Sequence, residues 1–179
     1  MRSLVTLACA SCAFATAAIA QDVMKPGPEH ARIGYFAGTW QMTGEVKASP
    51  MGPGGAMSAT ESCEWFQGGF QMVCRGDVSG PRGPAKTGSV WTYDTVLKSY
   101  TFFGYNSYGE SFYVLGGVDG KVWTWNAEMP MEGGGNMKLR AIITEESPTA
   151  YTFRFEGSPD GTTWMLFEEG RATKRGATR

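Results

Sequence analysis

The sequence predicts an all-β protein, an antiparallel up-and-down β-barrel of about ten strands with a short N-terminal helix. Glycine makes up 25 of the 179 residues and separates short alternating or aromatic runs, which is typical of a many-stranded antiparallel protein. Turn signals lie between these runs, for example at residues 118–120 and 158–161. The runs leave no space for crossover helices, and a meander this long protects its edges by closing, so we expect a barrel.

The helix is expected at about residue 29, where two prolines precede it and where Ile33, Phe36 and Ala37 share one helical face. After Gly38 the hydrophobic period changes from that of a helix to two, which indicates the first strand. The expected strands are residues 39–48, 57–67, 69–79, 85–93, 99–106, 110–117, 121–129, 136–145, 149–156 and 161–172.

The N-terminus has the pattern of a secretory signal peptide: Arg2, an apolar run over residues 4–18, and small residues at the cleavage position before Gln21. The run is too short and too rich in alanine for a membrane anchor. We therefore expect a signal peptide at 1–20, a flexible mature N-terminus at 21–28, a single barrel domain at 29–175 and a disordered tail at 176–179. The predicted location is the periplasm or the extracellular medium.

The charge balance excludes one class of partner. Sixteen basic residues oppose 17 acidic ones, and removal of residues 1–20 takes away only Arg2. Because no basic block or stripe is present, we expect no nucleic-acid partner. No later apolar run approaches the roughly 20 residues of a transmembrane segment. The oligomeric state is not predicted by the sequence.

Two cysteines remain once the signal peptide is removed, Cys63 and Cys74, and an oxidising compartment favours a disulfide between them. They flank a hairpin signal at Gly68-Gly69, and folding the chain about this turn places residue 63 opposite 74 and 65 opposite 72. A two-residue loop would make the cysteines a hydrogen-bonded pair, and a four-residue loop would make them the closer, non-hydrogen-bonded pair. Both geometries allow a structural disulfide.

Alternation along the strands predicts the inner wall of the barrel. Trp40, Met42 and Val46 share one face of the first strand, and this face is expected to line the lumen. Several later strands add one apolar face each, whereas the strands around Trp91, Phe102 and Phe112 are apolar on both faces and their direction stays open. The candidate ligand-binding residues of the lumen are Trp40, Met42, Trp65, Met72, Trp123, Trp125, Phe153 and Phe155. The alternative is that these large side chains fill the interior completely.

A family resemblance follows from these residues. The short helix followed by Gly38-Thr39-Trp40 resembles the opening of lipocalin and wider calycin barrels. Over residues 26–175 the chain resembles exported members of the domain-of-unknown-function family 1579, through the segments PGPEHARIGYFAGTW, MPMEGGGNMKLR and YTFRFEGSPDGTTWMLFEEGRATKR. The resemblance implies a lipocalin-like barrel and no established activity. The same opening resembles haem-binding nitrobindin barrels, but these bind iron through a histidine far along the chain, and no histidine follows His30 here. We expect no cofactor.

No catalytic constellation is present in the sequence. His30 has no orienting carboxylate, because adjacent helical residues such as Glu29 point apart, and helix packing or capping is its alternative role. The pairs Glu145-Glu146 and Glu168-Glu169 each place only one carboxyl inside a barrel. Methionines bracket the loops at residues 51–57 and 129–137, and thioethers suit Cu(I), but methionine is also the usual filler of barrel mouths. We predict no metal site and no catalytic residue.

Barrels that begin with Gly-x-Trp often place an arginine of the last strand over that tryptophan. The resemblance therefore implies closure of the barrel base by Trp40 and Arg171, with Lys174 as the alternative cation. The leading functional hypothesis is an exported barrel that binds a small apolar or amphipathic molecule without chemistry on it. The alternative is a structural or protein-interaction barrel with a filled lumen, and an enzyme acting on the bound molecule is the third.

Overall fold

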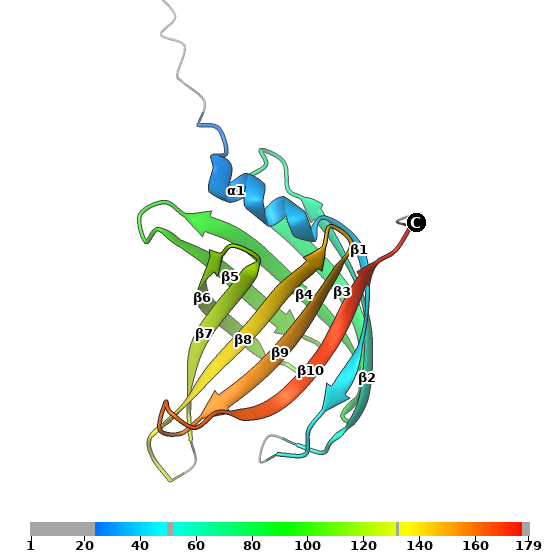
Figure 1. Ribbon diagram of the computed structural model, residues 1–179, viewed down its shortest axis with the longest axis vertical. Helices are drawn as coiled ribbons and strands as arrows, with labels where there is room; N and C mark the ends of the chain where they lie inside the picture. The colour runs from blue at the N-terminus through cyan, green and yellow to red at the C-terminus, as the bar shows by residue number, and fades with distance from the viewer. Residues whose placement is uncertain (1–23, 50–51, 132, 177–179) are drawn as a thin grey trace, which may run out of the picture.

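The computed structural model describes residues 24–49, 52–131 and 133–176. The predicted signal peptide, Met51 and residues 177–179 of the expected tail lie outside these ranges. The described chain forms a closed barrel of ten antiparallel strands in which each strand pairs with its neighbours in sequence and β1 pairs with β10 (Figure 1). The strands are β1 Gly38–Val46, β2 Gly55–Trp65, β3 Met72–Gly80, β4 Gly83–Asp94, β5 Ser99–Asn106, β6 Ser111–Asp119, β7 Val122–Pro130, β8 Asn136–Ser147, β9 Ala150–Ser158 and β10 Met165–Lys174.

The predicted fold class and the number and order of the strands are confirmed. Most strand ends differ from the prediction by one or two residues, and the largest difference is the start of β10, at Met165 rather than 161. The carboxylate of Asp160 accepts hydrogen bonds from the backbone N–H groups of Thr162 and Thr163, at 2.7 and 2.8 Å. These bonds stabilise a longer turn, because an aspartate side chain that caps the following N–H groups holds the chain out of the strand conformation.

The Cys63–Cys74 disulfide is present and joins opposite residues of β2 and β3. The backbone N–H of Phe66 donates to the carbonyl of Gln71, so residues 67–70 form a four-residue loop. Counting from that pair, Cys63 and Cys74 form a non-hydrogen-bonded pair, and their Cα atoms are 4.1 Å apart. Of the two geometries that the sequence allowed, the structure therefore has the closer, non-hydrogen-bonded pair.

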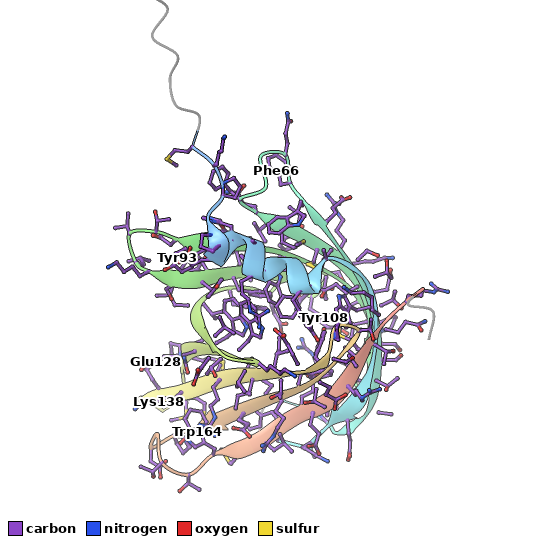
Figure 2. All side chains as sticks on the ribbon, turned by 45° about the horizontal axis from the view of Figure 1, so that its top comes forward. Phe66, Tyr93, Tyr108, Glu128, Lys138 and Trp164 are labelled. Atoms are coloured by element: carbon purple, nitrogen blue, oxygen red, sulfur yellow. A yellow bond between two sulfur atoms is a disulfide. The ribbon has the colours of Figure 1, made fainter. Side chains whose placement is uncertain are left out.

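The N-terminal helix closes one end of the barrel. Helix α1 Pro28–Ile33 continues as the 3-10 turn η1 Gly34–Phe36 and lies across the barrel end (Figures 1 and 2). Ile33 and Phe36 are buried against the end of the lumen. We call this the closed end, and the opposite one, with the β1–β2 and β7–β8 loops, the open end.

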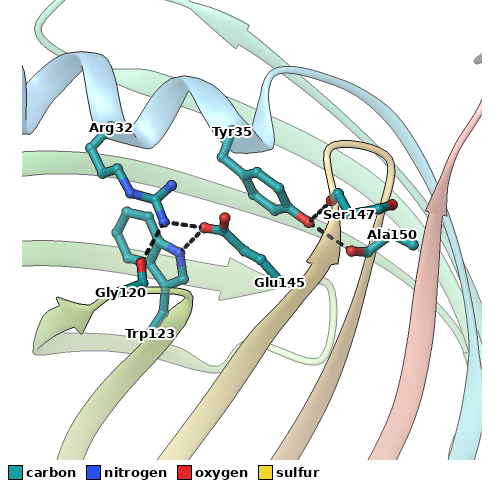
Figure 3. Close-up of polar contacts among 7 residues, drawn as sticks. All are labelled: Arg32, Tyr35, Gly120, Trp123, Glu145, Ser147 and Ala150. Carbon is teal, nitrogen blue, oxygen red and sulfur yellow. Dashed lines mark hydrogen bonds and ion pairs between the residues drawn. The ribbon is translucent and has the colours of Figure 1, made fainter.

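Two polar contacts fasten the helix to the β8–β9 side of the closed end (Figure 3). The guanidinium of Arg32 donates to the carboxylate of Glu145 at 2.5 Å, and Trp123 Nε1 donates to the same oxygen at 2.6 Å. The hydroxyl of Tyr35 lies within 3.0 Å of the carbonyls of Ser147 and Ala150. Burial and the nearby Glu145 raise the pKa of Tyr35 to about 12, so the phenol stays a hydrogen-bond donor.

The cation over Trp40 is Lys174 and not Arg171, which corrects that part of the prediction. Lys174 pairs with Trp40 in the β1–β10 register, and its Nζ lies 4.8 Å from the centroid of the tryptophan ring. Arg171 is three residues away, which places its side chain on the opposite face of β10, and it pairs with Glu146 outside the barrel at 2.8 Å. No helix of the described ranges is long and apolar enough to cross a membrane.

Candidate functional site

The closed-end half of the lumen is filled with side chains. Trp40, Trp123, Met72 and Phe36 are each at most 2 % exposed and pack with the disulfide into one cluster. Trp40 Nε1 donates to the carbonyl of Phe36 at 2.8 Å, so its polar atom is satisfied within the plug. This half of the lumen has the close packing of a protein core and leaves no room for a ligand.

The eight predicted lumen residues are divided between three environments. Trp40, Met72 and Trp123 belong to the filled closed-end core, and Trp125 borders it at 5 % exposure. Met42 and Phe153 are partly buried against that core, and Phe155 lines a cavity at the open end. Trp65 is 37 % exposed, because it is the last residue of β2 and lies at the rim beside Gly34 of the helix segment.

The open-end half is hollow. A cavity of about 280 Å³ lies inside the barrel mouth, close to the lower size limit of small-molecule sites. Its inner-wall residues are largely apolar, and the loops at the mouth complete its lining. The inner-wall residues are Val46, Met57, Val78, Phe155, Phe167 and Glu168, and the loop residues include Pro53, Pro81, Arg82 and Tyr108.

Glu61 is an acid on the inner wall of β2. It pairs in register with Trp40 of β1 and lies two residues before Cys63, so its side chain is on the face of the disulfide. The Oε2 atom lies 3.8 Å from Sγ of Cys63. That sulfur carries no proton because it is bonded to Cys74, so the contact is not a hydrogen bond. Burial raises the pKa of Glu61 to about 7.

Glu168 is another acid of the inner wall and lies at the open end of the barrel. It pairs in register with Val46 of β1 and lines the open-end cavity. The loss of solvent also raises its pKa. Among the described residues, neither Glu61 nor Glu168 has an ion-pair partner or a hydrogen-bond donor.

A polar atom of Trp125 is also without a partner. Trp125 is on the inner face of β7, and its buried Nε1 makes no hydrogen bond within the described ranges. Its ring packs against Trp91 and Phe102, with centroid distances of 5.2 and 5.9 Å, and Phe102 stacks on Phe112.

The structure thereby settles the direction of the aromatic strands: Trp91, Phe102 and Phe112 face inward. Their neighbours Phe103 and Tyr113 face outward, by alternation.

Other polar clusters have structural explanations. His30 is 4 % exposed, its Nδ1 accepts a hydrogen bond from the N–H of Gly27, and its ring packs edge-on against Phe70, so it caps and anchors the helix. Glu61, Cys63 and Cys74 place three ligand-type atoms within 4.8 Å of one another. The two sulfurs are joined in the disulfide and are not available as thiolate ligands, so the described residues of this cluster do not fit a metal ion.

A larger hollow, of about 800 Å³, lies on the outside of the barrel wall over β1–β4 and β10. Its lining combines exposed polar side chains, such as Gln41 and Thr43, and the surface ion pair of Asp77 and Lys86 with apolar residues such as Met42. It lies on the outer surface and not inside the lumen. The smaller cavity inside the lumen is therefore the better candidate site.

Sequence reasoning missed Glu61 and Phe167, and it placed one carboxyl of the pair Glu168-Glu169 inside the barrel without assigning which one. Glu61 has the same strand parity as Cys63, and Glu168 that of Ala172, so period-two alternation extended along each strand would have found both. Phe167 could not be placed by alternation, because the β9–β10 register shifts between Leu166 and Glu168. This bulge brings Phe167 against Phe155, with ring centroids 5.9 Å apart.

Comparisons with known proteins agree with this architecture. A family model described as "Protein of unknown function (DUF1579)" matches residues 25–174, so the chain belongs to this family. No curated protein matches the chain. The crystal structure of Rv2717c from M. tuberculosis is similar, with a TM-score of 0.58 and 10% identity over 83% of this chain and 98% of that one. This likeness shows the fold alone.

Two further solved barrels have lower similarity. EF1p2_mFAP2b, solved bound to DFHBI, has a TM-score of 0.42 and 14% identity over 82% of this chain and 99% of its own. The redesigned β-barrel b11L5F_LGL has a TM-score of 0.39 and 15% identity over 79% and 93% of the two chains. Neither similarity is high enough to contribute to an argument about function.

Proposed function

We propose that this member of the DUF1579 family is an exported barrel that binds a small apolar or amphipathic molecule in the open-end half of its lumen, without chemistry on that molecule. The observation that carries the proposal is the contrast between the two halves. The closed end is packed to completion, whereas the open end retains a cavity of about 280 Å³. A barrel that needed only a core would be expected to fill both halves.

The chemistry of the cavity supports an amphipathic ligand. Val46, Met57, Phe155 and Phe167 provide apolar area, and Met57 adds a flexible side chain that adapts to different shapes. The polar group among the inner-wall residues is Glu168. Mostly apolar walls with few polar groups are typical of sites that fix the orientation of a small molecule by one end.

Export is the second half of the proposal. It is supported by the signal-peptide pattern of residues 1–20 and by a disulfide that would be reduced in a typical cytosol. Fractionation of cells followed by N-terminal sequencing tests it. We expect a soluble species outside the cytoplasm that begins near Gln21. An uncleaved cytoplasmic chain would contradict this half of the proposal.

Ligand binding is tested by mass spectrometry of the natively purified protein, combined with titration of a panel of fatty acids, sterols, tetrapyrroles and alkyl amines monitored by tryptophan fluorescence. A Phe155→Ala, Phe167→Ala variant enlarges the cavity and removes its aromatic wall, and we expect altered affinity for any ligand. Tyr113→Ser, on the outer face of β6, is the matched control. No retained molecule and no quenching by any member of the panel would overturn the carrier proposal.

A second candidate, a protein-interaction or structural barrel, is favoured by the outer aromatic strip, which we define as Phe103, Tyr105, Tyr113 and Leu115. These side chains are 39–58 % exposed on the outer faces of β5 and β6. Phe103 and Tyr113 are directly opposite each other, so the strip is continuous. If this candidate is correct, Phe103→Ser, Tyr113→Ser abolishes association with a protein or envelope surface in co-sedimentation and leaves the lumen unaffected.

A further inference from the structure

We propose that the ligand of the lumen is a cationic amphiphile, an apolar body carrying a protonated amine, and that Glu168 receives the amine from the inner wall of the open-end cavity. This inference rests on the proposed function, because it names the ligand class of the same cavity. Three observations carry it: the distribution of ion pairs, the unpartnered polar groups of the lumen and the chemistry of its walls.

Among the described residues, Glu61 and Glu168 lack the cation that many acids around them have. Glu145, the inward acid opposite Tyr151, is paired with Arg32 of the helix at 2.5 Å. On the outer face, Glu169 pairs with Lys47 at 3.3 Å and Glu64 pairs with Arg75 at 3.4 Å. Ion pairs also hold Glu45, Asp77, Glu110, Glu146 and Glu156. Glu61 and Glu168 have no such partner in the described part of the chain. The inward cation nearest to this wall in register, Lys174, lies over Trp40 and donates to the carbonyl of Tyr35 at 3.3 Å.

An unpaired carboxyl inside a protein carries a desolvation cost, so it is expected to be protonated or to have a partner. Glu168 lines the open-end cavity, so the position of its carboxyl indicates that the partner comes from outside the chain. The buried Trp125 Nε1 is an independent sign that the polar groups of the lumen are not satisfied by the protein itself. A ligand in the cavity with a donor group at one end would satisfy Glu168.

The walls also discriminate between head groups. Aromatic faces such as those of Phe153 and Phe155 attract an ammonium group, and the apolar mouth accommodates an alkyl or aryl body. A carboxylate head group beside Glu168 would meet an acid of its own sign, which disfavours fatty acids. A neutral alcohol would bind through its apolar body alone. The predicted order of affinity is therefore amine, alcohol, carboxylate.

The test is isothermal titration of the mature full-length protein at pH 8 with decylamine, decanol and decanoate, which share one tail and differ in their head group. We expect decylamine to bind about ten-fold or more tightly than decanol, because charge-assisted hydrogen bonds are about twice as strong as neutral ones. In Glu168→Gln the decylamine affinity falls to that of decanol, while decanol binds as in the wild type. The matched control is Glu169→Gln, which removes the neighbouring outer acid of the same strand and leaves all three affinities unchanged.

The outcomes separate this inference from the proposed function. Equal binding of the three ligands by the wild type, or an amine preference that survives Glu168→Gln, overturns the amine assignment and leaves the carrier function in place. No binding of any of the three, with no retained molecule in the native protein, overturns both. Retained decanol binding shows that the Glu168→Gln variant is folded, so loss of the amine preference alone supports the inference.

Discussion

Glu61 and Glu64 lie three residues apart on β2, but their carboxyl groups are on opposite sides of the barrel wall. Glu64 faces solvent beside Arg75, whereas Glu61 faces the lumen beside the disulfide and has no donor within the described residues. The same strand therefore holds one acid in an ordinary environment and one that is desolvated. This difference makes the stability of the protein dependent on pH in a direction opposite to that of most paired carboxylates.

The first prediction is that stability falls as the pH rises from about 5 to 8. Burial raises the folded-state pKa of Glu61 to about 7 from its ordinary value of 4.5, so the folded protein holds a proton that the unfolded chain has released. Stability from this group is present below the unfolded pKa and lost as the pH rises through the folded one. The shift corresponds to roughly 3 kcal/mol. Tyr151, whose pKa burial and Glu61 raise further, stays protonated throughout.

Urea unfolding at pH 5 and pH 8 measures this effect. Glu61→Gln is expected to be more stable than the wild type at pH 8 and to have a smaller difference between the two pH values. Glu64→Gln is the control and should follow the wild type. Parallel pH dependence of the wild type and Glu61→Gln would show that Glu61 titrates normally and is not desolvated.

The second prediction concerns the contact between Arg32 and Glu145 that fastens the helix (Figure 3). Glu145 is largely buried, with 11% of its side chain exposed, and Arg32 is partly exposed at 30%. Arg32→Ala leaves the carboxylate with only the Trp123 N–H as a donor, and we expect a loss of about 2 kcal/mol, less than for a fully buried pair. A double-mutant cycle with Glu145→Gln measures the coupling.

The exposed pair of Arg75 and Glu64 is the matched control for this cycle, with side chains more than two-thirds exposed. Its coupling is expected to be at most about 0.5 kcal/mol. Equal coupling in the two pairs would mean that the helix is not held by the Arg32 contact.

The sequence predicted the barrel because its fold depends on local, repeated signals. The prediction used glycine turns, a hydrophobic period of two and one hairpin with cysteines at matching positions. Each of these signals requires only a few neighbouring residues, and the structure has the ten strands in the expected order. The same local signal placed Cys63 opposite Cys74. These features are set before the chain closes, so no long-range information is needed to predict them.

The candidate site was predicted only in part, because it depends on where the helix lies. Trp40 and Phe155 both have inward parity, but the helix segment fills the space around Trp40 and leaves that around Phe155 open. Alternation predicts which face of a strand a residue lies on, but not how deep in the lumen it lies. It also fails at the β10 bulge, where Phe167 and Glu168 are neighbours in sequence and both line the cavity.

The third prediction is that the disulfide contributes about 3 kcal/mol to stability. The bridge closes a loop of 12 residues and restricts the unfolded chain, which is its main effect in the chain-entropy model. We expect Cys63→Ala, Cys74→Ala, and the wild type reduced with dithiothreitol, to unfold at lower urea concentration by similar amounts. A reduced wild type as stable as the oxidised one would show that the bridge is dispensable for stability.

The last prediction concerns the base of the barrel. The aliphatic stem of Lys174 packs against Gly38, and its Nζ lies over the Trp40 ring, so Lys174→Ala removes both packing and a cation–π contact. We expect a loss of about 1 kcal/mol, and a smaller one for Lys174→Met, which retains the stem. Arg171→Ala removes only an exposed ion pair with Glu146 and is expected to cost at most about 0.5 kcal/mol. Urea unfolding of the three variants distinguishes the two cations, and a larger loss for Arg171→Ala than for Lys174→Ala would mean that the base is closed by Arg171 after all.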